Sequence, residues 1–323
     1  MREDGKLSYF WKEPIILNYM LKLHIDSETN KLHTVILGIA NSNGPTPKAE
    51  EAYDPKSLEH ILAGTYPLEE DMIKELDAFQ QVLLKHGVHV LRPETIPHLN
   101  QIFTRDIGFV IDEYFFKSNI LPDRAQEWEA IQSIVHQIPS TQFITAPEKV
   151  HIEGGDVLLH HEHIFIGTYT GADYPEINTA RTNTYAVDFI RELFPKKIVK
   201  SFDLIKSMKD PKSNALHLDC CFQPVGTHYG IIYKEGFRNE NDYEYLVELF
   251  GKENLFHIDA NGMYEMNSNV FSISKDVVVS EQGFQDLNQW LRAKGILVEE
   301  IPYYEIGKQE GLLRCSTLPL LRD

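Results

Sequence analysis

Residues 269–303 read NVFSISKDVVVSEQGFQDLNQWLRAKGILVEEIPY and contain the clearest copy of a unit that recurs along the chain. Residues 269–281 consist of two short β-type runs, which predict a hairpin turning near Lys275 and Asp276. Residues 284–295 predict an amphipathic helix ended by Gly295, and residues 296–303 predict a returning strand. The unit is therefore a hairpin, a helix and a strand.

The same order occurs at four earlier places. One copy has its hairpin over residues 108–119, its helix over 122–138 and its strand over 142–147. The next has its hairpin over 155–167, its helix over about 180–194 and its strand over 196–202. A third has its hairpin over 220–235, its helix over about 240–250 and its strand over 254–259. The first copy is more elaborate and runs from a strand at 34–40 through a helix at 66–87 to a strand at 88–93. Each unit leaves a hydrophobic face that only its neighbours can cover, so five units indicate one domain with cyclic internal symmetry. No Gly/Ser linker divides residues 1–323, which are expected to form a single domain.

Residues 41–65, NSNGPTPKAEEAYDPKSLEHILAGT, are the longest irregular stretch. A long loop in a compact domain is usually functional or mobile. We interpret this segment as a candidate lid.

The charge of the chain argues against nucleic acid as a partner. Its 323 residues carry 31 Lys and Arg against 48 Asp and Glu, a formal charge of −17. Proteins that bind nucleic acid gain affinity by neutralising phosphates with Lys and Arg, and no stretch of this chain concentrates them. Hydrophobic residues at 42% and charged residues at 24% are typical of a globular protein.

The cysteines and the first residues favour a reducing compartment. The chain has three cysteines, Cys220, Cys221 and Cys315, and two of them are adjacent. An odd number with this spacing does not form the pattern of a disulfide-stabilised protein. Residues 1–28 contain only short apolar runs broken by charges, so neither a signal peptide nor a membrane span is predicted there. We expect a cytoplasmic protein with no membrane partner, and the sequence leaves the oligomeric state open, a homo-oligomer included.

Polar clusters stand at equivalent places in the repeat, just outside its strands, where the copies of a cyclic array converge. These clusters are Phe103-Thr104-Arg105-Asp106, Glu153-Gly154-Gly155-Asp156, His217-Leu218-Asp219 and Leu313-Arg314-Cys315-Ser316-Thr317. A Cys, a His and several carboxylates are the components of covalent cysteine catalysis. Surplus carboxylates suit a cationic substrate, because two of them match the N–H groups of a planar guanidinium.

Five motifs in this order resemble those of the guanidino-group-modifying enzymes of the pentein superfamily, which includes arginine deiminase, dimethylarginine dimethylaminohydrolase and glycine amidinotransferase. The motifs are FTRD (103–106), EGGDVL (153–158), ARTN (180–183), HLDCCF (217–222) and RCSTLPLLR (314–322). The resemblance implies a five-bladed α/β-propeller with pseudo-fivefold symmetry and one catalytic domain over residues 1–323. It also implies C–N cleavage at the guanidino carbon of arginine or a derivative.

The resemblance also implies roles for individual residues. Cys315 would be the nucleophile that forms an amidino-thioether, His217 the general acid and base, and Glu153 the partner of both His217 and the guanidinium. Asp106 and Asp219 would clamp the guanidinium, Arg181 would bind the substrate carboxylate, and Asp156 would either touch substrate or cap a turn. A cationic substrate beside Cys315 would itself lower the pKa of the thiol.

Other interpretations stand beside these. Alone, Cys315 would more often be a buried apolar filler, but the motifs around it favour catalysis. We interpret Cys220 and Cys221 as core and edge residues, and the histidines at 160, 161 and 163 as a hairpin tip rather than a zinc site. Arg105 and Arg314 either bind a substrate carboxylate or balance a neighbouring charge. No metal or organic cofactor is expected, since the chemistry needs only a nucleophile, a base and a charge clamp.

The final acceptor separates the functional alternatives. The intact Glu153 and the ARTN run favour a hydrolase, whereas the N-terminal layout of VILGIANSNG (35–44) and HGVHVLRP (86–93) is as much like the amidinotransferases. A non-catalytic binding propeller would lack the Cys, His and Glu set that this chain retains. A thiol hydrolase acting on amides would need an oxyanion hole and would not explain so many clustered acids.

Overall fold

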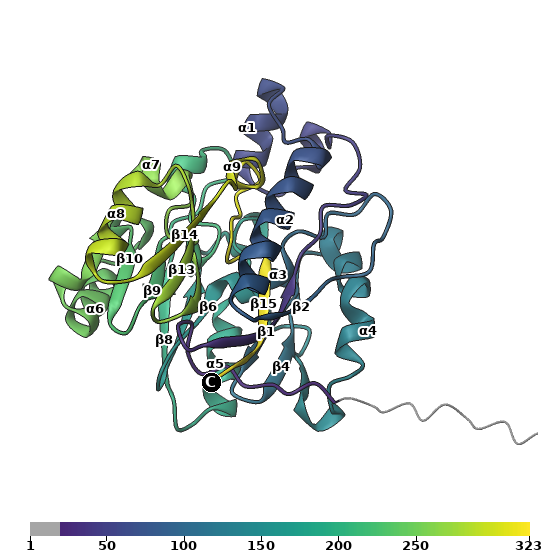
Figure 1. The fold of residues 1–323 in the computed structure, drawn as a ribbon. Coiled ribbons are helices and arrows are strands. Elements are labelled where there is room, and N and C mark those ends of the chain that lie inside the picture. Colours follow the sequence, from purple (N-terminus) through teal and green to yellow (C-terminus); the bar gives the residue numbers. More distant parts are fainter. Residues whose placement is uncertain (1–19) are drawn as a thin grey trace, which may run out of the picture.

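The computed structural model describes residues 20–323 (Figure 1). Residues 1–19, which hold most of the stretch expected to lack a signal peptide or membrane span, lie outside the described residues. None of the helices in residues 20–323 combines the length and apolarity needed to cross a bilayer.

Five separate three-stranded sheets make up the β structure, and all follow one pattern. In each sheet the middle strand pairs antiparallel with one neighbour and parallel with the other. In chain order the sheets hold β3 (Gly108–Ile111), β4 (Tyr114–Lys117) and β5 (Phe143–Thr145); β6 (Val157–His160), β7 (His163–Thr168) and β8 (Ile198–Asp203); β9 (Phe222–Val225), β10 (Tyr229–Ile232) and β11 (Leu255–His257); β12 (Phe271–Ser274), β13 (Val277–Glu281) and β14 (Leu297–Ile301); and β15 (Thr317–Arg322), β1 (Leu32–Leu37) and β2 (His89–Leu91). The predicted hairpins and returning strands are confirmed, and so is the α/β class.

Helices connect the second and third strands of the units. The α-helices are α1 (Pro55–Ala63), α2 (Glu69–Lys85), α3 (Thr104–Ile107), α4 (Gln132–Val135), α5 (Thr184–Leu193), α6 (Glu240–Phe250), α7 (Ala260–Tyr264), α8 (Gln285–Ala293) and α9 (Tyr304–Gly307). Short 3₁₀ helices include η1 (Ala49–Glu51), η2 (Pro122–Ile131), η4 (Gly154–Asp156) and η7 (Leu218–Cys220). As predicted, α8 is followed by Gly295, whose φ of 81° lies in the left-handed region that glycine tolerates best.

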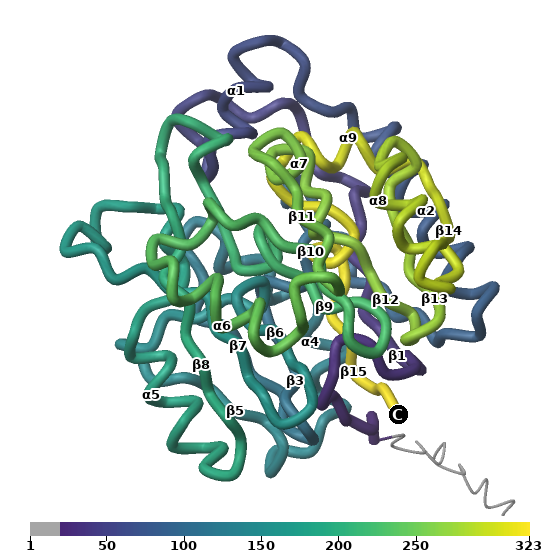
Figure 2. Tube along the Cα trace, turned by 90° about the vertical axis from the view of Figure 1, so that its left-hand side faces the viewer, coloured from purple at the N-terminus to yellow at the C-terminus, as the bar shows by residue number. Residues whose placement is uncertain are grey.

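The strand β15 was not predicted, and it joins the two ends of the chain. It pairs antiparallel with β1, with Leu37 opposite Thr317 and Ile36 opposite Leu318, and the two strands lie side by side in Figure 2. Residues 314–322 were interpreted as a catalytic motif. No local sequence pattern shows that residues 317–322 form a strand whose pairing partner is β1. The pairing completes the first sheet, which otherwise would hold only β1 and β2.

Two other expectations were wrong in part. Residues 41–65 are not irregular throughout, because η1 and α1 lie within them. Asp54 caps α1 by accepting the N–H of Ser57, and Gly64 ends it with a φ of 66°. Residues 122–138 form mostly the 3₁₀ helix η2 instead of an α-helix. Side chains three residues apart eclipse in a 3₁₀ helix, and the buried pair of Arg124 and Glu127 has that spacing.

The polar clusters lie at corresponding points of the units, directly before a first strand. Asp106 in α3 precedes β3, η4 precedes β6, η7 precedes β9, and the turn that carries Cys315 precedes β15. Two clusters of buried apolar side chains lie around them, one of which contains Phe79 in edge-to-face contact with Phe271 and Tyr303 at centroid distances of 5.6 and 5.7 Å. The fold therefore brings residues from distant parts of the sequence to one place.

Candidate active site

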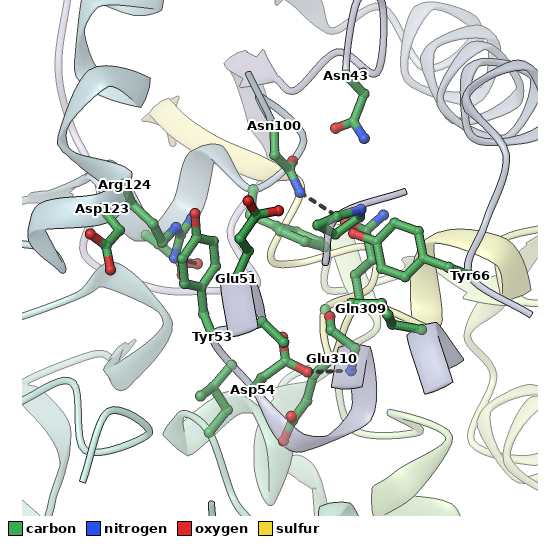
Figure 3. A pocket seen from close by; sticks show the side chains of 18 of the residues that line it. Asn43, Glu51, Tyr53, Asp54, Tyr66, Asn100, Asp123, Arg124, Gln309 and Glu310 are labelled. Atoms are coloured by element: carbon green, nitrogen blue, oxygen red, sulfur yellow. Dashed lines mark hydrogen bonds and ion pairs between the residues drawn. The ribbon is translucent and has the colours of Figure 1, made fainter. Parts of the chain in front are cut away.

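A cavity of about 800 Å³ lies where these clusters meet. Of the predicted site residues, Asp106, Arg181, His217 and Cys315 line it. Residues from the 41–65 segment form one wall, and Figure 3 shows its Glu51, Tyr53 and Asp54 close to side chains from other parts of the chain. Glu153, Asp156 and Asp219 are buried outside the lining and are at most 1% exposed.

Cys315 is held by its main chain in the turn before β15. Its N–H donates to Oδ1 of Asn269 at 3.1 Å, and its carbonyl accepts the N–H of Arg105 at 3.1 Å. Its Sγ lies 3.7 Å from Oδ2 of Asp219. Burial raises the pKa of the thiol, and the negative charges of Asp219 and Asp106 raise it further. The surroundings therefore favour the thiol form, and a positive charge in the cavity would oppose this effect.

His217 and Glu153 form a buried pair. Nε2 of His217 lies 2.8 Å from Oε2 of Glu153, and its Nδ1 lies 3.8 Å from Oδ1 of Asp106. Burial lowers the pKa of His217, but Asp106 and the bond to Glu153 outweigh it, so the pKa is raised. Burial also opposes ionisation of Glu153, but Arg181 and His217 hold its pKa well below the usual range. Both shifts therefore favour the charged forms, an imidazolium beside a carboxylate.

One carboxylate oxygen of Asp106, a residue that lines the cavity, has no hydrogen bond. Its Oδ2 accepts from Arg124 at 3.0 Å. Its Oδ1 is buried and has no hydrogen-bond partner among the described residues. Leaving a buried acceptor unsatisfied costs about 1–3 kcal/mol, more for a charged group. A ligand that places an N–H group here would satisfy it.

Two arginines neutralise these carboxylates. Arg124, which the sequence analysis missed, binds both oxygens of Glu127 at 2.7 and 2.8 Å and also binds Asp106. Arg181 donates from Nη1 to both oxygens of Glu153 at 3.3 and 3.2 Å, from Nη2 to the carbonyl of Tyr53 and from Nε to that of Asn178. The guanidinium nitrogens of Arg181 bind groups of the protein itself, and the expected contact of Arg181 with a substrate carboxylate stays a prediction.

Asp156 and Asp219 lie outside the cavity lining and bind groups next to the residues that line it. Oδ1 of Asp156 accepts the N–H of Leu218 at 2.9 Å, so it fixes the backbone next to His217, which corresponds to the turn-capping alternative. Oδ2 of Asp219 accepts from Arg314 at 2.7 Å. Neither residue lines the cavity, and the expected contact of Asp219 with the guanidinium stays a prediction.

The alternatives for the arginines and cysteines are also decided by burial. Arg314 is 0% exposed and binds Asp219 and both oxygens of Glu28, so it balances charge. Arg105 is buried beside it and lies outside the lining. Cys220 and Cys221 are 1% and 0% exposed, so both are buried, and they directly precede β9, an edge strand of its sheet.

Asp106, Glu153 and His217 could together offer atoms to a metal ion. One possible ligand atom from each residue lies within 4.8 Å of the other two. Within residues 20–323, these three residues form the group of His, Cys, Asp or Glu side chains that is close enough together to hold a metal ion. Two carboxylates and an imidazole are suitable ligands for a divalent cation. However, the carboxylates already face Arg124 and Arg181, so their charge is compensated by the protein itself.

Comparisons with known proteins identify a matching family and related sequences. Residues 65–322 match the family described as N,N dimethylarginine dimethylhydrolase, eukaryotic. The uncharacterized protein YkgA of Bacillus subtilis is 29% identical over 247 residues, covering 75% of this chain and 77% of YkgA. The arginine deiminase of Oenococcus oeni is 24% identical over 206 residues, covering 53% of this chain, which spans 47% of the deiminase's length.

Solved structures show the same fold. The N-terminal domain of ArgZ, an arginine dihydrolase from the ornithine-ammonia cycle in cyanobacteria, has a TM-score of 0.73 at 17% identity, covering 90% of this chain and 98% of that one. Inosamine-phosphate amidinotransferase StrB1 from Streptomyces griseus has a TM-score of 0.71 at 14% identity, covering 94% of this chain and 97% of that one.

Proposed function

The chain belongs to the family described as N,N dimethylarginine dimethylhydrolase, eukaryotic, within the pentein superfamily of guanidino-group-modifying enzymes, and from this premise we propose that it hydrolyses a C–N bond at the guanidino carbon of arginine or an arginine derivative. The chain is an enzyme, either a guanidino-group hydrolase or an amidinotransferase, so the non-catalytic alternative falls. We also propose that the five sheets are the blades of a five-bladed propeller and that residues 1–323 form its single catalytic domain. The recurrence of polar clusters before first strands supports that arrangement.

The unused Oδ1 of Asp106 carries this proposal. It is a buried acceptor on Asp106, a residue that lines the same cavity as Cys315 and His217. A guanidinium that donates an N–H to this oxygen brings a cation and an electrophilic carbon into the cavity together. Its charge opposes the two carboxylates that raise the pKa of Cys315, so substrate binding releases the thiol proton to solvent and leaves the thiolate.

In the first half of the reaction the thiolate of Cys315 attacks the guanidino carbon. The C–N bond to one amine breaks, and the imidazolium of His217 gives that amine its proton. The products of this half are the free amine, a neutral imidazole and a positively charged amidino-thioether. Glu153 holds the imidazole through its hydrogen bond to Nε2.

In the second half water replaces the amine. His217 takes a proton from water as the oxygen attacks the amidino carbon, and the C–S bond then breaks to return the thiolate. The second water proton ends on the released amine, so the reaction converts a guanidinium and water into a ureido product and an ammonium ion. An amidinotransferase would use an acceptor amine in place of water.

Product identification tests the proposal. The purified protein is incubated with arginine, its N-methylated forms and agmatine, with and without glycine or lysine, and products are identified by mass spectrometry. We expect citrulline or another ureido product without any acceptor. Ornithine together with a new guanidino compound, formed only when an acceptor is present, would instead establish the amidinotransferase.

His217→Asn is expected to lower kcat by about 10²- to 10⁴-fold, because the leaving amine loses its proton donor and water its base. Intact-protein mass spectrometry during turnover shows which half-reaction is slower, since an adduct accumulates only if the second half is impaired. A variant with wild-type kcat would remove His217 from the mechanism.

Gly155→Ala is expected to reduce kcat by at least about tenfold without unfolding the protein. A Cβ on Gly155 would lie 2.5 Å from Nδ1 and 2.6 Å from Cγ of His217, so the imidazole must move, and small displacements of catalytic groups have large effects on rate. Gly230→Ala in β10 is the control, because its Cβ would meet Leu255 at 2.9 Å and Phe222 at 3.1 Å, and none of these three residues lines the cavity. Equal kcat values for the two variants would show that the imidazole is not held as described.

A further inference from the structure

Asn269 lies two residues before β12, so in the fifth unit it is close to the place that the polar clusters hold in the others. No role was assigned to it above. It is 0% exposed, and its main-chain carbonyl accepts the N–H of Arg314 at 3.2 Å. Asn269 is therefore fixed beside the turn that carries the nucleophile.

Both polar atoms of its side chain contact Cys315. Oδ1 accepts the N–H of Cys315 at 3.1 Å, and Nδ2 lies 3.2 Å from Sγ. A main-chain N–H can only donate, so the amide oxygen must face it and the NH₂ group must face the sulfur. Rotating the amide by half a turn would place two donors against each other and the oxygen against the sulfur.

The carboxylate of Asp219, another polar group close to the sulfur, has the opposite effect. Burial and this negative charge raise the pKa of the thiol, whereas the main chain of Leu312 and the charge of Arg314 lower it. Oδ2 of Asp219 lies 3.7 Å from Sγ, where its charge disfavours a thiolate. Within residues 20–323, the side-chain amide of Asn269 is the side-chain group that donates a hydrogen bond to Sγ of Cys315. Neither Arg124 nor Arg181 has such a bond, because their guanidinium groups bind Glu127, Asp106 and Glu153.

We propose that Asn269 is a catalytic residue whose Nδ2–H stabilises the thiolate of Cys315, both when it attacks the guanidino carbon and when it leaves the amidino-thioether. Its Oδ1 at the same time fixes the main chain of the nucleophile. This inference rests on the proposed function, since it takes Cys315 as the nucleophile. It adds no bond-making step, and the thiol proton still leaves to solvent when the cation binds.

Asn269→Asp is the informative substitution. It keeps an oxygen for the N–H of Cys315 but replaces the donor to sulfur with a negatively charged acceptor. A hydrogen bond to a charged group corresponds to a factor of about 10 to 150, so kcat/KM should fall by at least about tenfold. The loss should appear in kcat, because Asn269 does not line the cavity. The apparent pKa for alkylation of Cys315 by iodoacetamide, followed by peptide mass spectrometry, should rise by about one unit or more.

Asn267→Ala is the matched control. Asn267 lies two residues earlier on the same loop and forms no hydrogen bond with Cys315, so its kcat and alkylation profile should equal those of the wild type. Asn269→Ser, which keeps a smaller hydroxyl donor, should lose less activity than Asn269→Asp. If Asn269→Asp alkylates and turns over within about twofold of the wild type, the proposal is overturned.

A measurement on the wild-type protein covers the case in which the variants do not fold. The side-chain amide signal of Asn269 in ¹⁵N NMR should shift when Cys315 is alkylated, and an unchanged signal would contradict the hydrogen bond. Failure of this inference is distinguishable from failure of the proposed function. Full activity in Asn269→Asp with an inactive Cys315→Ala overturns the role of Asn269 alone, whereas an active Cys315→Ala overturns both.

Discussion

Cys315→Ala is expected to reduce turnover of every guanidino substrate by at least about 10⁴-fold, which is the scale of loss when a catalytic nucleophile is removed. Cys315 is the one cysteine that lines the cavity in residues 20–323, and it lies there with the unused oxygen of Asp106 and with His217. The histidine cannot substitute for it, because its Nε2 already binds Glu153. The measurement is product formation over long incubations, together with intact-protein mass spectrometry for the covalent adduct.

Cys221→Ala is the matched control for the loss of a buried thiol. Cys221 is 0% exposed, and its Sγ donates to the carbonyl of Leu218 instead of facing the cavity. Both variants remove one sulfur from the core, so a general effect of the cavity left behind would appear in both. We expect wild-type turnover in Cys221→Ala and no adduct in Cys315→Ala. Normal turnover by Cys315→Ala would rule out covalent catalysis at this residue.

Arg314→Leu is expected to lower the free energy of unfolding by about 3–5 kcal/mol, the usual effect of removing one partner from a buried ion pair. Its guanidinium binds Glu28 at 2.9 and 3.2 Å and Asp219 at 2.7 Å, and it also donates to the carbonyl of Val157 at 2.7 Å. The substitution leaves two carboxylates buried without this cation. Urea denaturation followed by circular dichroism measures the loss.

The dependence on pH gives this prediction a second signature. Burial opposes ionisation of Glu28, but Arg314 and Arg105 outweigh it and lower the pKa from 4.5 to about 2. A carboxyl with a lowered pKa contributes stability above its unfolded value and loses it as the pH falls through its folded value. In the wild type this contribution is therefore present above pH 4.5 and disappears towards pH 2. In Arg314→Leu it should be much smaller across that window.

Arg191→Leu is the control for loss of an arginine in general. Arg191 pairs with Asp188 at 2.7 Å, but both side chains are more than half exposed, and exposed pairs contribute about 0.2–1 kcal/mol. A change below about 1 kcal/mol in both variants would show that Arg314 is not needed to neutralise Glu28 and Asp219.

Local pattern was sufficient for most of the fold. The spacing of apolar residues predicts hairpins, helices and returning strands. The predicted bounds of four complete units therefore lie within a few residues of the observed ones. Pattern was insufficient where tertiary pairing decides the structure. The 3₁₀ helix η2 is accompanied by the buried pair of Arg124 and Glu127, and β15 is a strand because β1 lies beside it.

The candidate site divides in the same way. The identities of Cys315, His217, Glu153 and Asp106 followed from motifs in a recognisable order, because such motifs keep the residue types that the chemistry needs. Their contacts did not follow. Arg181 matches a motif position, yet in the structure its guanidinium binds Glu153 and the carbonyl of Tyr53.

The sequence by itself determined the α/β class, the repeated unit and some of the residues that line the cavity, namely Asp106, Arg181, His217 and Cys315, since each of these depends on neighbours close in the chain or on a short motif. Only the tertiary structure decided which charges are neutralised and what touches the nucleophile. Arg314 lies 286 residues from Glu28, and Asn269 lies 46 residues from Cys315. Hydrogen bonds and ion pairs act over a few ångströms, so a side chain's role is set by whichever groups folding brings within that distance.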